Sequence, residues 1–346
     1  MDSALHLLSL AYGACARGRN ALFDAGLRSA RRAPAFVVSV GALSVGGAGK
    51  TPFVQTLARL FRERVAEANP FAILSRGYGR SSRGSVIVSD GRGSIIADAS
   101  QSGDEALCHA RAFPDAPVVV APRRRRACRL AVEKFGAQIV VLDDGFQHRS
   151  LYRDVDICLL DERSLAAESL LPKGVLREPY SALRRADVVC FLPEAPPQSH
   201  AVWSFIRPDA LLLTAEMRND ECCDGASREK IRIDRPALAV CGVAQPERFF
   251  QSLRAAGVPF AGTLSFPDHC SYGRAEIRRI ADAAEKLGVS DIVVTDKDYV
   301  KLALHEEVWR ARRLRLAVLP VRCVLSQGED ALCQELRRRL FARFAE

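Results

Sequence analysis

The sequence predicts an α/β protein, with a parallel-sheet domain of the P-loop NTPase type and a second, smaller α/β domain. Three observations predict this fold class. Short β-rich runs alternate with helical patterns, which is typical of a parallel sheet with helices on both faces. A glycine-rich turn at residues 44–51 joins one such run to an amphipathic helix. The 346 residues, 48% of them hydrophobic, suffice for two domain cores.

The first predicted element is an amphipathic helix within residues 3–32. Its first half presents an apolar face, and its second half is crowded with arginines: Leu5, Leu8, Tyr12 and Cys15, then Arg17, Arg19, Arg28, Arg31 and Arg32. Such a helix either lies in an anionic membrane surface or packs on the first domain with its arginines in water. Because Asp2 precedes the apolar stretch, we do not expect a signal peptide, and no run predicts a transmembrane span.

The strands follow in two series. The first series comprises residues 35–43, 71–76, 116–122, 137–144 and 155–161, and the second comprises residues 186–192, 211–217, 236–243, 291–296 and 315–325. Helical patterns occupy residues 246–257, 274–288 and 329–346. We predict a first domain over residues 1–185 and a second over residues 186–346, and leave open whether the last helix packs back on the first domain.

The net charge and the spacing of the cysteines indicate which classes of function to exclude. A net charge of +9 indicates anionic partners, but aromatic residues make up only 7% of the chain and no nucleic-acid reader motif is present, so we expect no nucleic-acid partner. The eleven cysteines form no C-x-x-C pair. Their scattered spacing is typical of reduced thiols in the cytoplasm rather than of a zinc site or a disulfide framework.

The turn SVGGAGKT fits the P-loop pattern, except that serine replaces its first glycine. Glycines let backbone N–H groups approach phosphate oxygens closely. We therefore predict that the nucleotide phosphates lie against Ser44, Val45, Gly46, Gly47, Ala48, Gly49, Lys50 and Thr51. In such loops the lysine reaches the β- and γ-phosphates, and the threonine hydroxyl binds Mg²⁺.

Acidic residues supply the rest of the predicted site. Asp143 and Asp144 follow the apolar run 139–142, where a carboxylate at a strand end can hold Mg²⁺. Asp104 and Glu105 lie at a predicted helix start, and His269 follows Asp268 in the second domain. These are candidates for activating an acceptor hydroxyl. The basic loops at residues 76–80, 122–127 and 171–179 either hold phosphates or are simply solvated.

Seven segments occur in an order that resembles the tetraacyldisaccharide 4′-kinase family of lipid A biosynthesis: SVGGAGKTP, RGYG, GDE, LDDGFQH, LPKGVLREP, FPDH and TDKDYVKL. The resemblance spans about residues 36–302. It implies two α/β domains around a cleft, joined by a short two-stranded link. It also implies transfer of the ATP γ-phosphate to the 4′-hydroxyl of a tetraacyl glucosamine disaccharide 1-phosphate, giving lipid IVA, by a peripheral enzyme on the cytoplasmic face of the inner membrane.

The resemblance also assigns roles to residues. It implies that Asp104 pairs with His269 to activate the hydroxyl, that Arg177 lies in the active-site cleft, and that the acids around Mg²⁺ are Asp143, Asp144 and Glu105. Lys50 of the glycine-rich loop is the further catalytic candidate. We expect the Asp104–His269 pair to form only when the cleft closes. Two departures are TDKD at residues 295–298, where the family has TEKD, and Cys270 after the histidine.

The main alternative is a P-loop GTPase or ATPase switch of the metallochaperone or protein-targeting kind. TDKD differs from the Asn-Lys-x-Asp motif that would recognise guanine, and the chain has no tract rich in histidine or cysteine. We therefore favour the kinase, with ATP and Mg²⁺ as cofactors, the acyl disaccharide and an anionic membrane surface as partners, and no obligate protein partner.

Overall fold

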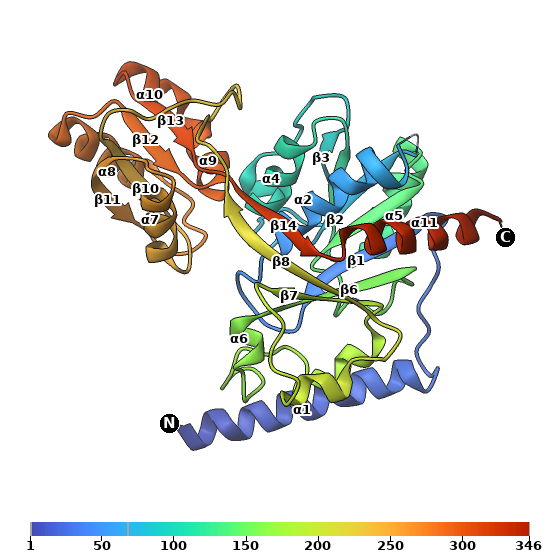
Figure 1. The fold of residues 1–346 in the computed structure, drawn as a ribbon. Coiled ribbons are helices and arrows are strands. Elements are labelled where there is room, and N and C mark those ends of the chain that lie inside the picture. The colour runs from blue at the N-terminus through green and yellow to red at the C-terminus, as the bar shows by residue number, and fades with distance from the viewer. Residues whose placement is uncertain (1, 68, 346) are drawn as a thin grey trace.

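A computed structural model describes residues 2–67 and 69–345, and confirms the α/β fold class (Figure 1). The described residues form a nine-stranded and a five-stranded sheet. Each sheet is parallel in its interior and carries antiparallel strands only at its edges.

The larger sheet has the strand order β14-β8-β7-β6-β1-β5-β2-β4-β3. Its strands are β1 (Phe36–Ala42), β2 (Phe71–Ser75), β3 (Val86–Asp90), β4 (Pro117–Val120), β5 (Ile139–Asp143), β6 (Val155–Asp161), β7 (Val188–Leu192), β8 (Leu211–Asn219) and β14 (Val321–Gln327). The central strands are buried on both faces, because their β-branched and apolar side chains meet helices above and below.

Helices cover both faces of this sheet. One core contains side chains of α2 (Lys50–Leu60), α4 (Asp104–Ala112) and α11 (Glu329–Ala345), and the core on the other face contains those of α5 (Arg124–Phe135). The remaining helical segments are α1 (Asp2–Asp24), η1 (Phe61–Val65), α3 (Ala99–Ser102), α6 (Glu162–Leu165), η2 (Tyr180–Arg185) and η3 (Ala201–Phe205).

The smaller sheet has the order β11-β10-β12-β13-β9. Its strands are β9 (Cys223–Asp224), β10 (Ala237–Cys241), β11 (Phe260–Ser265), β12 (Asp291–Val294) and β13 (Arg315–Val318). Around it lie α7 (Pro246–Ala255), α8 (Arg274–Leu287), α9 (Asp296–Leu302), η4 (Ala303–His305) and α10 (Glu306–Ala311). Two further cores fill its two faces.

The change from one sheet to the other lies later in the chain than the predicted boundary at residues 185 and 186. Strands β7 and β8 extend the larger sheet, and the smaller sheet begins only at β9. The chain returns through β14, which pairs antiparallel with β8, so that these two strands link the two parts of the molecule (Figure 1). Helix α11 then packs in the core of the larger sheet.

Some elements differ from the prediction. The run at 315–325 is two strands in different sheets, separated at Pro320, which has no N–H for a ladder bond. Strands β3, β9 and β11 were not predicted; all three are edge strands, β9 has only two residues, and β3 and β11 are half-buried with a weak hydrophobic pattern. The first helix ends at Asp24, before the last three arginines of its predicted range.

No helix within residues 2–67 and 69–345 is long and apolar enough to cross a membrane.

Candidate active site

The P-loop lies between the carboxyl end of β1 and the start of α2. Gly49 precedes the helix with φ 72°, a left-handed conformation that favours glycine, and a side chain there would also displace the end of Met217. Lys50 is buried, and its Nζ donates to the carbonyl of Gly46 at 3.1 Å and lies 3.7 Å from Asp144 Oδ1. The loop therefore directs the lysine back across its own turn, as a phosphate site requires.

The first two residues of the predicted phosphate site, Ser44 and Val45, are more buried than the two glycines that follow them. Ser44 is fully buried and its hydroxyl donates to Asp161 at 3.3 Å. The N–H of Val45 donates to the carbonyl of Val175. Gly46 and Gly47, in contrast, are exposed. Ser44 and Val45 thus anchor the loop, while the glycines face outward.

Asp143 lies beside the P-loop because β5 pairs in parallel with β1 and both strands end at the same edge of the sheet. Its side chain is buried, and the Thr51 hydroxyl lies 3.5 Å from Oδ2. The other oxygen, Oδ1, is buried and has no hydrogen-bond partner among the described residues. A buried acceptor without a donor is costly unless a ligand completes it, so this oxygen and the threonine hydroxyl fit a divalent cation.

His109 is a residue of this site that the sequence reasoning missed. It lies near the end of α4, is fully buried, and contacts Asp143 Oδ2 through Nε2 at 2.9 Å. Burial disfavours the charged form of Asp143, but the hydrogen bond from His109 and the charge of Lys50 hold the pKa of the carboxyl below its usual value. The sequence signal for this residue was a histidine on an apolar face of the helix that begins near Asp104.

Asp144 is held by two cations. Arg177 donates through Nη1 to both of its carboxylate oxygens, at 2.9 and 2.7 Å, and Lys50 Nζ lies 3.7 Å from Oδ1. Asp144 has φ 55°, a conformation that asparagine and aspartate tolerate better than most residues and that is enriched at functional sites. The structure therefore brings the predicted residues Lys50, Asp144 and Arg177 together.

Asp104 and His269 meet across the two sheets. His269 donates from Nδ1 to Asp104 Oδ2 at 2.9 Å, and the N–H of Glu105 donates to Asp104 Oδ1. Burial favours a higher pKa for Asp104, but the hydrogen bond from His269 and the charges of Lys297 and Lys301 outweigh it and hold the pKa at about 2. The same hydrogen bond raises the pKa of His269. The pair is already formed in this structure, contrary to the expectation that only cleft closure assembles it.

Glu105 does not join the other predicted metal ligands. Its Oε1 accepts from Lys297 Nζ of α9 at 2.7 Å. The described residues contain no cluster of three or more His, Cys, Asp or Glu suited to a metal. Thr51 and Asp143 are therefore the predicted ligands with atoms open to a cation, whereas Asp144 and Glu105 are paired with basic side chains.

The basic loops have distinct positions. Tyr78 of RGYG packs against the His269 ring, with the ring centroids 5.4 Å apart. Arg124 of PRRRR is buried and donates to the carbonyls of Ala121 and Asp143, and burial lowers its pKa to about 10. Arg163, which the sequence did not single out, lies over the P-loop: its Nη1 would be 3.1 Å from a Cβ at Gly46.

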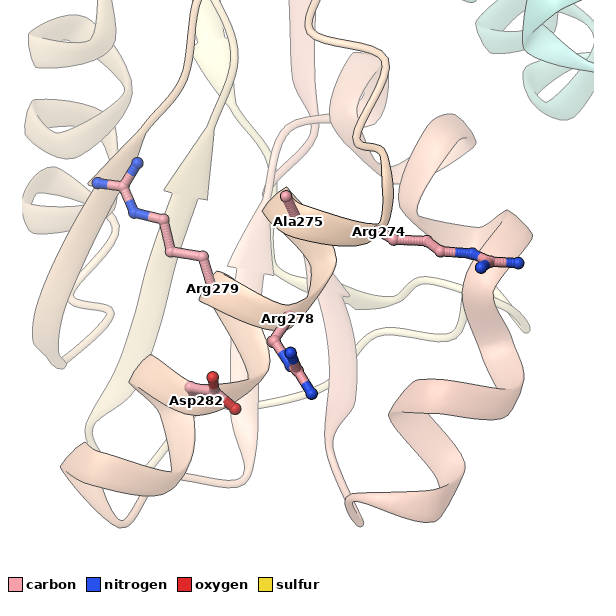
Figure 2. Close-up of a pocket in the computed structure, with 5 residues that line it drawn as sticks. All are labelled: Arg274, Ala275, Arg278, Arg279 and Asp282. Atoms are coloured by element: carbon pink, nitrogen blue, oxygen red, sulfur yellow. The ribbon is translucent and has the colours of Figure 1, made fainter.

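A second basic feature lies away from this site. An open hollow of about 720 Å³ on α8 of the smaller domain is lined by Arg274, Arg278 and Arg279. Figure 2 shows that the three guanidinium groups point in different directions rather than toward a common point. The hollow therefore lacks the convergent donors that an anion site needs.

Helix α1 rests on the segment that carries Arg177. Polar contacts attach it there: the Ser9 hydroxyl donates to the carbonyl of Leu170, the Tyr12 hydroxyl donates to that of Arg177, and Arg19 pairs with the fully buried Glu178. Arg19 is therefore committed to the protein rather than free for a lipid. The apolar side chains of the helix are outward: Leu5, Leu7, Leu8 and Leu10 are 36 to 69% exposed.

Comparison with known proteins agrees with this geometry. A family model for tetraacyldisaccharide-1-P 4′-kinase matches residues 1–340. A tetraacyldisaccharide 4′-kinase from Anaeromyxobacter dehalogenans (strain 2CP-C) is 38% identical over 338 residues, covering 95% of this chain and 88% of the relative. One from Pelodictyon phaeoclathratiforme (strain DSM 5477 / BU-1) is 35% identical over 344 residues, covering 95% of each.

A solved structure matches as well. The crystal structure of LpxK from Aquifex aeolicus in complex with ATP has a TM-score of 0.78 and 30% identity, and the match covers 98% of this chain and 99% of that one. The fold, the residues gathered at the carboxyl ends of β1 and β5, and these matches lead to one assignment. The chain belongs to the tetraacyldisaccharide-1-phosphate 4′-kinase family.

Proposed function

We infer from the family assignment that the chain is an ATP-dependent lipid kinase. It transfers the γ-phosphate of ATP to the 4′-hydroxyl of a tetraacyl glucosamine disaccharide 1-phosphate, the step of lipid A biosynthesis that gives lipid IVA. One observation within the structure supports this most directly: a continuous set of contacts joins the P-loop, through Asp143, His109 and α4, to the Asp104–His269 pair. The alternative of a GTPase or ATPase switch is not supported by the family match.

We propose that the Asp104–His269 pair accepts the proton of the 4′-hydroxyl. Both oxygens of Asp104 are engaged, whereas His269 is about one-third exposed and its Nε2 has no hydrogen bond within the described chain, its nearest charged partner being Asp268 Oδ2 at 3.9 Å. Nε2 is thus the atom open to the acceptor, and Asp104 fixes the ring tautomer and stabilises the imidazolium. The 4′-oxygen forms a bond to the γ-phosphorus as the bond from that phosphorus to the β,γ-bridging oxygen breaks, and ADP leaves.

Lys50 and Arg177 supply positive charge at the transferred group. Lys50 is directed across the P-loop, and both Lys50 and Arg177 contact Asp144. Charge spreads over the oxygens of the γ-phosphoryl group during transfer, and preorganised cations stabilise it. In this proposal Asp144 holds both cations in place for that task.

The Thr51 hydroxyl and Asp143 Oδ1 are oxygen atoms suited to binding Mg²⁺. Mg²⁺ usually takes one or two protein oxygens and completes its shell with water and substrate phosphates. When bound, it would neutralise charge on the phosphates of the nucleotide. Asp144 and Glu105 stay predicted ligands that would first have to leave their basic partners.

We propose that α1 places the enzyme on the cytoplasmic face of the inner membrane. An acceptor with four acyl chains is held in a bilayer, and α1 offers outward leucines next to the Arg177 segment. Arg17 and Arg28 are exposed and available to anionic headgroups. Apolar burial at the headgroup boundary and basic residues of this kind are the two contributions that hold a peripheral helix at a membrane.

The experiment that tests the activity follows labelled phosphate. Purified chain is incubated with [γ-³²P]ATP, Mg²⁺ and tetraacyl disaccharide 1-phosphate in mixed micelles, and the lipids are separated by thin-layer chromatography. We expect label in a lipid that carries one more phosphate than the acceptor. ATP hydrolysis that proceeds equally without the lipid, and leaves the lipid unlabelled, would overturn the proposal.

A further inference from the structure

One polar group inside the larger domain is not explained by the activity itself. His109 is fully buried, yet it contacts a single polar partner, Asp143 Oδ2 at 2.9 Å. Its second ring nitrogen, Nδ1, has no partner among the described residues. A carboxylate only accepts, so Nε2 carries the proton and donates it. Burying an imidazole is costly, and an apolar side chain would fill the same space without that cost.

The hydrogen bond constrains the carboxylate that faces the P-loop. His109 and Thr51 both approach Oδ2, at 2.9 and 3.5 Å, and neither contacts Oδ1. Rotation of the carboxylate about its Cβ–Cγ bond would break both contacts. The donor from α4 therefore keeps Oδ1 as the free oxygen, with both its lone pairs available.

The same helix carries the acceptor-activating residue. Asp104 is in the first turn of α4 and His109 is five residues later, about 7.5 Å along the axis. Asp104 contacts His269, and His109 contacts Asp143. One helix thus contacts both the proposed metal-binding carboxylate and the proposed acceptor-activating histidine.

We propose that His109 is a positioning residue for the divalent cation: through its Nε2–H it fixes the Asp143 carboxylate so that Oδ1 points to the metal of the Mg–nucleotide complex. This inference rests on the proposed role of Asp143 as a Mg²⁺ ligand. Hydrogen bonds to metal-binding groups orient those groups, and their loss typically lowers metal affinity by 10- to 100-fold.

The test measures cation binding without turnover. A fluorescent ATP analogue is titrated onto the full-length protein at a series of Mg²⁺ concentrations, and the half-saturating Mg²⁺ concentration is compared between variants. For His109→Leu, which removes the donor at similar volume, we expect an increase of about 10- to 100-fold. For His109→Gln, whose amide can donate from a similar position, we expect a value within about 3-fold of the wild type. Nucleotide binding in EDTA is expected to be equal in all three proteins.

A double mutant separates positioning from packing. In an Asp143→Asn background the further change His109→Leu is expected to leave the half-saturating Mg²⁺ concentration unaltered, since the oriented carboxylate is already gone. An unchanged value in His109→Leu, equal increases in His109→Leu and His109→Gln, or an undiminished effect in the Asp143→Asn background would each overturn the inference. Should His109→Leu not fold, His109→Met is read in the same way. Wild-type nucleotide binding that is independent of Mg²⁺ would instead contradict the proposed metal role of Asp143.

Discussion

At the scale of single residues, the site is built from buried charges that keep their ionised form through specific partners. Asp143 depends on His109 and Lys50, and Asp104 depends on His269 and the lysines of α9. An isolated buried carboxylate would take up a proton instead. Each pair therefore preserves a charge that the proposed phosphoryl transfer uses.

Lys50 gives the simplest prediction at this scale. Lys50→Ala removes the cation that lies between Gly46 and Asp144. Loss of one preorganised charge at a transferring group costs about 100-fold or more in rate, so we expect kcat/KM for ATP to fall by at least ~100-fold. Steady-state kinetics measure this, with the exposed Lys286→Ala as the control that should leave kcat/KM unchanged. Retention of most activity by Lys50→Ala would remove the lysine from the mechanism.

His148 gives a prediction for stability. Burial, and then the charge of Arg124, lower its pKa to about 4. The unfolded chain binds this proton near pH 6.5 and the folded chain does not, so the free energy of unfolding falls as the pH falls below about 6.5. After allowance for solvent screening, we expect the free energy of unfolding to fall by about 1–2 kcal/mol less in His148→Asn than in the wild type when the pH is lowered from 7 to 5. Urea unfolding at the two pH values measures this, and equal losses in both proteins would contradict it.

Among the helices and strands, the sequence predicted those parts of the site that are formed by one continuous stretch of residues. The turn at 44–51 and the strand that ends at Asp143 are continuous in the sequence, and parallel pairing of β1 and β5 brings them together. His109 was missed because its contact depends on which face α4 turns toward the sheet. The membership of β7 and β8 in the larger sheet was missed for a related reason: strand order follows from long-range pairing.

The way in which α1 is attached to the protein predicts the effect of changing its leucines. A helix packed through its leucines would bury Leu5 and Leu8, but the structure exposes them and attaches α1 through Ser9, Tyr12 and Arg19. We therefore expect Leu5→Ser/Leu8→Ser to leave the Tm nearly unchanged, to lower co-sedimentation with anionic vesicles and to raise KM for the lipid.

The control for α1 is Leu304→Ser, which removes a leucine of the smaller domain that is 60% exposed and should alter none of these quantities. If Leu5 and Leu8 were instead buried against the protein, each would contribute ~1.5–3 kcal/mol to the free energy of unfolding, and the double mutant would be destabilised. A large drop in Tm together with an unchanged vesicle-bound fraction would refute membrane docking by this face.

At the scale of the whole molecule, the two domains meet through charged contacts around α4. His269 reaches Asp104 from the loop before α8, and Lys297 and Lys301 reach Glu105 and Asp104 from α9. Strands β8 and β14 are the covalent link between the two parts (Figure 1). The proposed acceptor-activating pair is thus shared between domains, so its geometry depends on how they are placed.

We propose that Asp104 and His269 act as one unit built from two domains. The measurement is the single-turnover rate of phosphate transfer to the tetraacyl disaccharide 1-phosphate, at saturating MgATP, for Asp104→Ala, His269→Ala and the double mutant. Residues that act as a unit are strongly non-additive, so we predict that each single mutant is slowed by at least ~100-fold and that the double mutant is within about 3-fold of the slower one. Losses that multiply in the double mutant would show that the two residues work separately and would contradict the account.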